Sequence, residues 1–416
     1  MSWPEGRSSN RPFPKFIFLL LVLVVVVGLI YYVGQLKTGL VVTGLNSQVT
    51  WGIYIVNFIF CVGLSAGGIS VSALVHAFRI EKLKPVALIA EILSLSFLVM
   101  AAACIILDMG RPDRAFFVLL HANPRSPLVW DVTVINIYLI LCLALLWCSL
   151  RSDLQRLSRH VETTPRGVST SMAHPYELGR FLSWIAGEQT ESVHQRNERL
   201  LQRLSYVSIP VALALHSVTA WILGLAKGQP GWNTAILAPL FIVSALVSGI
   251  GVVILGAGAV RRFFAVPLPN DVTETLGRYL FFLLPVLIYF LFSEFITISY
   301  TGGLSHQRVM QEIIWGRFSR FLWFDVLVGI AIPFLLLGFY GRSQWSIQTA
   351  SFLAVVGVLA ERVNILLPSL MRFDPLRGEV SYMPTVKELT MVAAVYAMGA
   401  LVFCIFGYTL GRLEHK

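Results

Sequence analysis

The stretch FIFLLLVLVVVVGLIYYVG, residues 16–34, carries no charged side chain and is long enough to cross a lipid bilayer. A helix needs roughly 20 apolar residues to span the hydrocarbon core. Backbone polar groups must be satisfied internally in lipid, and the apolar residues are continuous rather than alternating, so helices are favoured over a β-barrel. Nine further runs of this kind follow, at residues 52–78, 86–107, 132–150, 204–226, 233–259, 279–300, 321–340, 345–370 and 389–410. The sequence therefore predicts an all-α integral membrane protein with ten transmembrane helices.

Composition and charge agree with a multi-pass membrane protein. Of the 416 residues, 56% are hydrophobic and 13% are charged, whereas soluble proteins carry about 25% charged residues. The net charge is +10, but Lys and Arg lie in short loops between the apolar runs, which is typical of topology determinants. We therefore expect no nucleic-acid partner.

The distribution of Lys and Arg predicts the orientation of the chain. More of them lie on the side that carries both termini and the segment 151–203 than on the opposite side. The positive-inside rule then places both termini in the cytoplasm and the chain in the inner (cytoplasmic) membrane. We interpret segment 151–203, the only long polar connection, as a solvated cytoplasmic loop, and a docking role for it stays open.

Five charged side chains interrupt the apolar runs: Glu91, Glu294, Asp325, Glu361 and Arg362. One charge at the centre of a bilayer costs about 2.5–3.5 kcal/mol by insertion scales, so such residues favour a function. In the predicted topology all but Glu91 lie toward the non-cytoplasmic face. In the functional interpretation, these residues bind a headgroup that exchanges protons, or they begin a proton path. In the structural interpretation, Glu294 and Arg362 form an ion pair between helices. Glu91 either extends a proton path toward the cytoplasm or is a structural residue whose carboxylate reaches the interface.

Further polar residues lie near the non-cytoplasmic face. Asp108 ends the third run, and Arg111 follows one helical turn later, a spacing at which the two can pair. Asn57 and Tyr138 lie at a similar depth in the second and fourth runs, and His216 lies nearer the middle of the fifth.

The pattern of cysteines and histidines argues against a redox centre within this chain. The five cysteines form no cluster with metal-ligand spacing. Only His76 and His216 fall within apolar runs, at different depths, so a haem with two axial histidines is not expected. We expect no metal site, no haem and no iron–sulfur cluster.

Several motifs carry a resemblance to a known family. They are DMGRP (108–112), SPLVWD (126–131), HSVTAW (216–221), PGW (230–232), SEF (293–295) and ER (361–362). Together they resemble the membrane subunits of the polysulfide reductase / NrfD-like family, in its ten-helix branch. The resemblance covers the chain from the second span to the tenth.

The resemblance implies a fold of two four-helix bundles with a flanking helix on each side. The N-terminal tail, first helix and loop would be residues 1–51, and the first bundle, with its cytoplasmic loop, residues 52–226. The second bundle would be residues 227–370, and an outer loop with the last helix residues 371–416.

The resemblance also implies a function. Members of this family are cofactor-free membrane subunits of respiratory complexes. They exchange electrons between a membrane quinone, menaquinone or ubiquinone, and an iron–sulfur or multihaem cytochrome subunit at the periplasmic face. Proton uptake or release accompanies this exchange, and a molybdopterin subunit is a further candidate partner. The loops at 108–131, 228–233 and 372–388 are expected to form the docking surface.

The expected site residues follow from these motifs and from depth in the membrane. Asp108, Glu294 and His216 are the expected catalytic residues. The expected quinone-binding residues are Asp108 and His216 again, with Asn57, Tyr138 and Arg111.

Two positions depart from the family pattern. Ile222 stands where members that translocate protons often carry an acidic residue, and Asn233 stands where a histidine often follows the Gly-Trp pair. These departures weaken a proton-pump interpretation such as that of alternative complex III, but they leave the quinone interpretation intact.

Two other classes of protein stay open. A secondary transporter or a proton-translocating channel subunit would break its helices near a midplane site, for example at Pro210, Pro333 or the small-residue run 66–68. Small residues in a span also favour close helix packing. A purely structural anchor would have the same partners but would bind no quinone.

Overall fold

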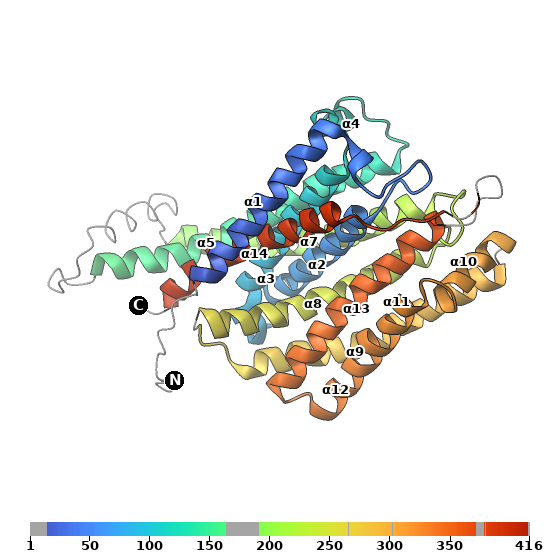
Figure 1. Cartoon of the computed structure of the whole chain (residues 1–416). Helices are drawn as coiled ribbons and strands as arrows, with labels where there is room; N and C mark the ends of the chain where they lie inside the picture. The colour runs from blue at the N-terminus through green and yellow to red at the C-terminus, as the bar shows by residue number, and fades with distance from the viewer. Residues whose placement is uncertain are drawn as a thin grey trace.

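The computed structural model describes residues 15–163, 191–264, 266–301, 303–371, 378 and 380–414. Within these residues, ten helical segments are long and apolar enough to cross a membrane, and no strand is present (Figure 1). The prediction of an all-α, ten-span membrane protein is confirmed.

The spans follow one another in the order of the apolar runs. They are α1 (Lys15–Thr38), α2 (Ile53–His76), α3 (Lys84–Asp108), α5 (Pro127–Thr163), α7 (Glu191–Gly224), α8 (Leu237–Phe263), α9 (Asn270–Thr301), a composite eighth span, α13 (Gln344–Leu370) and α14 (Val386–Glu414). The eighth span joins α11 (Ser319–Trp323), a π-helix η4 (Phe324–Ala331) and α12 (Ile332–Tyr340). Short helices η1 (Leu40–Val42), η2 (Glu81–Leu83), η3 (Pro112–Arg114), α4 (Phe117–Leu120) and α10 (Leu304–Ile314) lie in the connections.

Two spans reach further than their apolar runs. Helix α5 continues to Thr163 and α7 begins at Glu191, so both enter the segment that was interpreted as a loop. Hydropathy marks only the part of a helix that lies in hydrocarbon, whereas a helix continues until a breaking residue ends it. The first proline after α5 is Pro165. Residues 164–190 of the predicted loop lie outside the described residues.

The spans pack as two groups around a shared centre (Figure 1). In the first group α2 contacts α3 and α7, and α5 contacts both α3 and α7. In the second group α13 contacts α8, α9, η4 and α12. Helix α2 contacts α8 across the two groups, while α1 packs on α14, which in turn packs on α3. We propose the division into bundles at residues 52–226 and 227–370 on the basis of these contacts.

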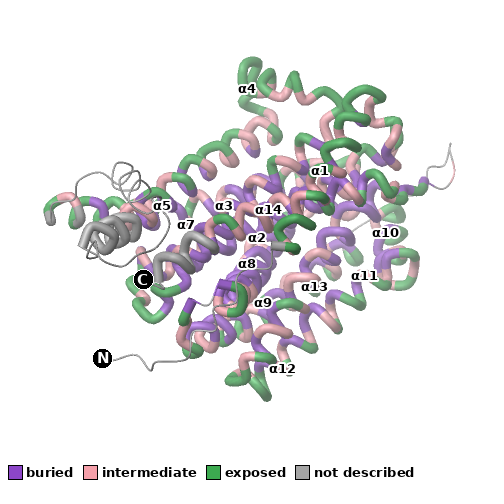
Figure 2. The backbone as a smooth tube through the Cα atoms, turned by 60° about the vertical axis from the view of Figure 1, so that its left-hand side comes forward, coloured by how far each residue is buried: buried purple, intermediate pink, exposed green. Residues whose placement is uncertain are grey.

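Burial identifies the central helices. Figure 2 shows α2 and α8 as largely buried, and 89% of the residues in the most apolar part of α2 are buried. Only 6% of the residues in the most apolar part of α1 are buried. Helix α1 is therefore peripheral, with an apolar surface that suits contact with lipid, and the α2–α8 contact forms the middle of the molecule.

The α2–α8 contact depends on two glycines. A Cβ atom at Gly67 would overlap the carbonyl oxygen of Ala245 and lie 2.6 Å from the Cα atom of Gly249. Small residues let membrane helices approach closely. Helix α2 runs without interruption through residues 66–68, so this run serves close packing and not a helix break.

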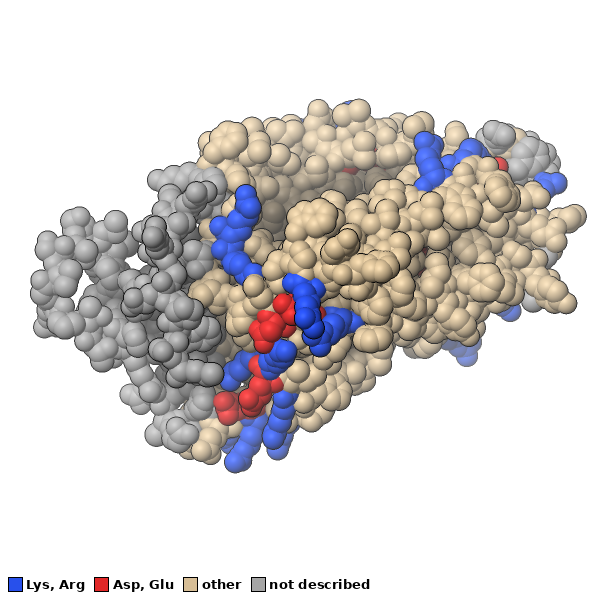
Figure 3. Space-filling model, turned by 90° about the horizontal axis from the view of Figure 1, so that it is seen from below, with Lys and Arg blue, Asp and Glu red and all other residues tan. Residues whose placement is uncertain are grey.

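The two ends of the molecule differ in what they carry. Helix α1 begins and α14 ends at one end, which we call the terminal end, whereas α4 and α10 lie at the other, the α4–α10 end (Figure 1). Charged side chains on the face seen in Figure 3 gather toward these two ends. This arrangement is that of a protein whose middle crosses the bilayer.

Candidate functional site

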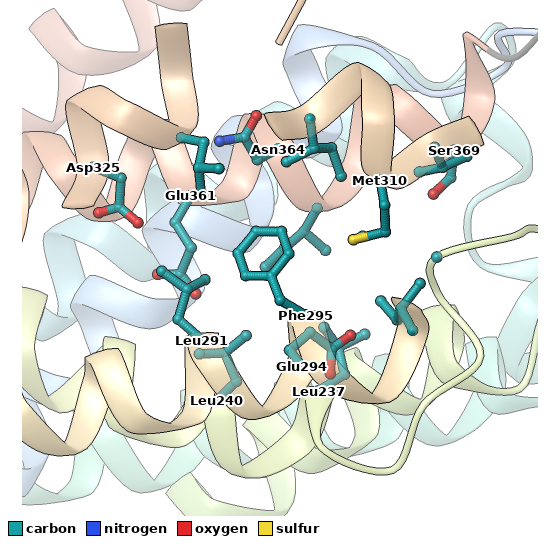
Figure 4. Close-up of a pocket in the computed structure, with 16 residues that line it drawn as sticks. Leu237, Leu240, Leu291, Glu294, Phe295, Met310, Asp325, Glu361, Asn364 and Ser369 are labelled. Carbon is teal, nitrogen blue, oxygen red and sulfur yellow. The ribbon is translucent and has the colours of Figure 1, made fainter. Parts of the chain in front are cut away.

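A cavity in the second group of helices collects three of the predicted residues. Glu294 from α9, Asp325 from η4 and Glu361 from α13 all line it, beneath the α4–α10 end (Figure 4). Their exposed fractions are 7%, 2% and 2%. The structure thus brings together three carboxyl groups that hydropathy had singled out one at a time.

Two oxygens in this cavity lack a partner. Thr234 Oγ1 donates to Glu294 Oε2 at 3.1 Å, but Asp325 Oδ1 and Glu361 Oε2 have no hydrogen-bond partner among the described residues. Buried polar atoms are normally bonded to protein, water or a ligand. The cavity has a volume of about 40 Å³, and a water needs roughly 10–15 Å³ by this measure. The site therefore has room for a few waters or a small polar group.

Arg362 does not reach Glu294, so the predicted ion pair between them is not formed. Its Nη1 lies 3.4 Å from Oε1 of the neighbouring Glu361. Its Nη2 donates to Ser244 Oγ on α8, and its guanidinium lies 4.1 Å from the centre of the Phe241 ring. The side chain is thus directed toward α8. Arg362 offsets the charge of Glu361 while it leaves Glu294 facing the cavity.

An irregular helix and a glycine contact position Asp325. Asp325 is the second residue of the π-helix η4, and π segments are rare and often occur at functional sites. A Cβ atom at Gly329 would meet the Cα atom of Gly357 at 2.6 Å and Asp325 Oδ1 at 2.9 Å. The two glycines therefore leave space in which the Asp325 carboxylate lies between η4 and α13.

Sequence reasoning missed two polar residues of the cavity, Asn364 and Ser369. Asn364 follows Glu361 by three residues on α13, a spacing that places both side chains on one face of a helix. That spacing was the signal that could have identified Asn364. No comparable signal marks Ser369.

The Pro-Gly-Trp motif closes the cavity at the α4–α10 end. Gly231 lines the cavity and adopts a φ of 91°, a conformation that favours glycine. A Cβ atom there would lie 2.9 Å from Ser369 Oγ. Trp232 stacks on Trp51 and donates from Nε1 to the carbonyl of Ile365 at 2.7 Å. The motif therefore fixes the connection before α8 against α13.

His216 lies apart from the cavity, where α7 meets α2 and α8. It is buried, its Nδ1 is 3.1 Å from the carbonyl oxygen of Ala212, and its Nε2 has no partner among the described residues. Its Nε2 would lie 3.9 Å from a Cβ atom placed on Gly63 of α2. An electrostatic interaction links it to Arg362. His216 therefore faces the junction between the two groups of helices.

Tyr138 and Asn57 face different neighbours. Tyr138 is fully buried in the first group, and its hydroxyl lies 3.2 Å from Ser65 Oγ. Asn57 Oδ1 accepts a hydrogen bond of 2.8 Å from Tyr396 of α14, and its Nδ2 donates to the carbonyl of Ile53. The structure therefore does not bring these two residues into one pocket.

Asp108 belongs to a polar cluster where α3 ends. Its Oδ1 is buried without a partner among the described residues, and it interacts electrostatically with Tyr54 and Glu388. Nearby, Gln35 Nε2 donates to the carbonyl of Leu107 at 2.6 Å. The predicted pair with Arg111 is not formed: α3 ends at Asp108, so the helical spacing no longer applies, and Arg111 is exposed.

Glu91 is buried between helices of the first group, and its two roles, in a proton path or in the structure, stay predictions. It is 1% exposed near the terminal end, where Ser72 Oγ donates to its Oε1 at 2.6 Å. His76 Nε2 lies 3.5 Å from the same oxygen. Adjacent helices thus hold Glu91 inside the first group.

Some predictions on cofactors and docking remain untested. Among the described residues, no group of three or more His, Cys, Asp or Glu is arranged to hold a metal, and the expectations about haem and iron–sulfur clusters stay predictions. In the expected docking loop 372–388, residues 372–377 and 379 lie outside the described residues.

The fold and the buried ionisable groups define a multi-pass helical membrane protein with polar sites between its spans. A comparison with family models assigns the class further: the model of the polysulphide reductase NrfD family matches residues 41–374. The chain belongs to this family.

Curated relatives extend over most of the chain. A protein of Halobacterium salinarum, provisionally described as a membrane subunit of a dimethyl sulfoxide reductase, is 29% identical and covers 92% of this chain and 88% of its own length. A subunit of the selenate reductase of Mesobacillus selenatarsenatis is 23% identical, with 94% and 92% covered. The Hdr-like menaquinol oxidoreductase integral membrane subunit of Archaeoglobus fulgidus is 25% identical, with 94% and 92% covered.

Proposed function

We propose that this chain is the quinone-reactive membrane subunit of a respiratory oxidoreductase complex. Family membership and the name of the Archaeoglobus relative, a menaquinol oxidoreductase subunit, support this proposal. The observation that carries it is a set of buried carboxyl oxygens toward one end of the molecule that have no partner within the described ranges, at Asp108, Asp325 and Glu361. Intramembrane ionisable residues of this kind mark functional sites by default.

The proposed chemistry needs proton exchange but no redox centre in this chain. Oxidation of a quinol to a quinone releases two electrons and two protons, and reduction takes up the same number. In our proposal the electrons pass to or from a metal centre of a partner subunit, an iron–sulfur or multihaem protein. Carboxyl groups of this chain take or give the protons. The family relationship supports a partner at the α4–α10 end, which we propose is the periplasmic face, and a molybdopterin subunit is a further candidate.

Asp108 is the strongest candidate for proton exchange in the first group of helices. Its buried Oδ1 has no hydrogen-bond partner in the part of the chain that the structure describes, and Tyr54 and Glu388 interact with it electrostatically. The same holds for the Nε2 atom of His216, which has no partner among those residues. Asn57 and Tyr138 would hydrogen-bond a quinone only after they give up their present hydrogen bonds with Tyr396 and Ser65. Arg111 is exposed close to the same end.

A comparison of two aspartates tests this proposal. Asp108→Asn removes the proton-exchanging group and keeps its size, so we expect quinone turnover by the intact complex to fall by at least about 100-fold. Asp271→Asn makes the same change at an exposed position toward the terminal end, away from the expected docking loops, and should leave turnover unchanged. Gel filtration and subunit staining establish that both complexes are assembled. Normal turnover in an assembled Asp108→Asn complex contradicts the proposed role.

A proton-translocating channel subunit is the second candidate function. The cavity between Asp325 and Glu361 and the π-helix next to it favour this alternative. The transporter class receives less support, because α2 and α7 run unbroken through residues 66–68 and Pro210, and only the position at Pro333 adjoins an irregular segment, the π-helix η4. Purification separates the two candidates: a quinone-reactive subunit should retain a metal-containing redox partner, whereas a channel or transporter should not.

A further inference from the structure

An apolar groove lies on the outer side of the second group of helices, next to the carboxylate cavity. Tyr289 and Phe292 of α9, Trp323 of α11 and Val326 of η4 line it, and its volume is about 460 Å³. Tyr289 and Phe292 are exposed on the surface that spans the membrane. The groove is therefore open to the lipid.

The groove and the cavity share a wall. Leu291, Phe295 and Leu322 line both of them. In Figure 4 the Phe295 ring projects into the cavity between the side that carries Glu361 and the side that carries Met310. An apolar groove open to lipid thus ends at a partition of three side chains, behind which lie Glu294, Asp325 and Glu361.

We propose that this groove and cavity form a quinone-binding site in the second group of helices, separate from the one around Asp108. The isoprenoid tail lies in the groove, and the headgroup reaches the carboxyl groups of Asp325 and Glu361 when Phe295 rotates. Rotation is required because the cavity now holds about 40 Å³, whereas a cavity that binds benzene measures about 150 Å³. This inference rests on the proposed function and adds a location to it.

The charge of the cavity selects the type of headgroup. Carboxyl groups that are ionised repel the phosphate of a phospholipid, and the guanidinium of Arg362 is directed toward Ser244 and Phe241. A neutral quinol instead donates its two hydroxyls to carboxylate oxygens, and a quinone accepts hydrogen bonds from protonated carboxyls. A molecule with an uncharged headgroup and a long apolar tail therefore fits both the cavity and the groove.

Photolabelling of the purified complex tests the proposal. A menaquinone analogue with an isoprenoid tail and a photoreactive azido group is bound, cross-linked and mapped by mass spectrometry. We expect label in peptides that contain residues 288–295 or 322–326. Val326→Trp fills the groove and should reduce this label at least about fivefold. Leu327→Trp places the same side chain at the next position, which is exposed and does not line the groove, and should leave the label unchanged.

Each other outcome is decisive. If label is found only in the first group of helices and Val326→Trp has no effect on it, the second site is overturned. The proposed function is then still supported. Phosphatidylglycerol and unlabelled quinone are each added as competitors. If phosphatidylglycerol displaces the label from the groove as well as unlabelled quinone does, the groove is a site for lipid chains, and the inference is also overturned. The absence of specific label anywhere contradicts the proposed function too. If Val326→Trp does not assemble, Ile314→Trp fills the groove from α10.

Discussion

Arg362 is 1% exposed, and its contacts explain how a full charge is tolerated inside the protein. Glu361 supplies the opposite charge, Ser244 accepts a hydrogen bond, and the Phe241 ring lies beneath the guanidinium. A buried ion pair adds little net stability, because its desolvation cost is close to its Coulombic gain. Removing one partner of such a pair, however, leaves a buried charge uncompensated.

This asymmetry gives a prediction for Arg362. Arg362→Ala should lower the free energy of unfolding by about 3–5 kcal/mol, because Glu361 then loses its partner. The double variant Glu361→Leu, Arg362→Leu removes both charges and should cost clearly less than the single change. Thermal unfolding of the purified protein in detergent measures both. Equal losses in the two variants would contradict this role of the buried charge pair.

At the residue scale, the sequence indicates how deep a residue lies in its span. Glu294, Asp325 and Glu361 lie at similar depth on three elements that pack together, so the sequence could indicate their grouping. It could not indicate directions of side chains: Arg362 points to α8, and the end of α3 removes Arg111 from Asp108. Asn57 and Tyr138 share a depth but face different neighbours.

At the scale of elements, the α2–α8 contact determines how the two groups of helices meet. Gly249→Ala should destabilise the protein by about 1–3 kcal/mol, because the new Cβ atom overlaps the Cα atom of Gly67. Gly34→Ala makes the same change in α1, where nothing lies within 4 Å. It should be neutral or stabilising by up to about 1 kcal/mol, since alanine favours a helix. Unfolding temperatures in detergent compare the two variants, and equal values would contradict the close α2–α8 contact.

The spans were predictable as elements, but their irregular parts were not. Apolar runs mark hydrocarbon-embedded helix directly, so all ten runs correspond to observed spans. The π-helix η4 packs through Gly329 against Gly357 of another span, a contact that a hydropathy pattern does not indicate. Helix α10 is too short and too polar for a hydropathy window, although it covers the cavity through Val309 and Met310.

At the scale of the whole molecule, the proposed orientation places the α4–α10 end outside the cytoplasm. Ala122→Cys near α4 should then react with an impermeant maleimide in intact cells. Arg199→Cys in the exposed first part of α7 should react only after the membrane is opened. Background is low, because four of the five native cysteines are buried and the fifth is partly buried. The reverse pattern of labelling would invert the topology and move the proposed partner to the cytoplasm.

The central claim is that this chain connects a membrane quinone to a metal centre held by another subunit. The most direct measurement purifies the complex through a tag on this chain, adds a quinol analogue, and follows the visible or electron-spin spectrum of the partner. The account predicts that quinol and quinone change the oxidation state of the partner's centre, and that this response disappears when this chain is removed. A complex without a redox-active partner, or a partner that responds equally well without this chain, would contradict it.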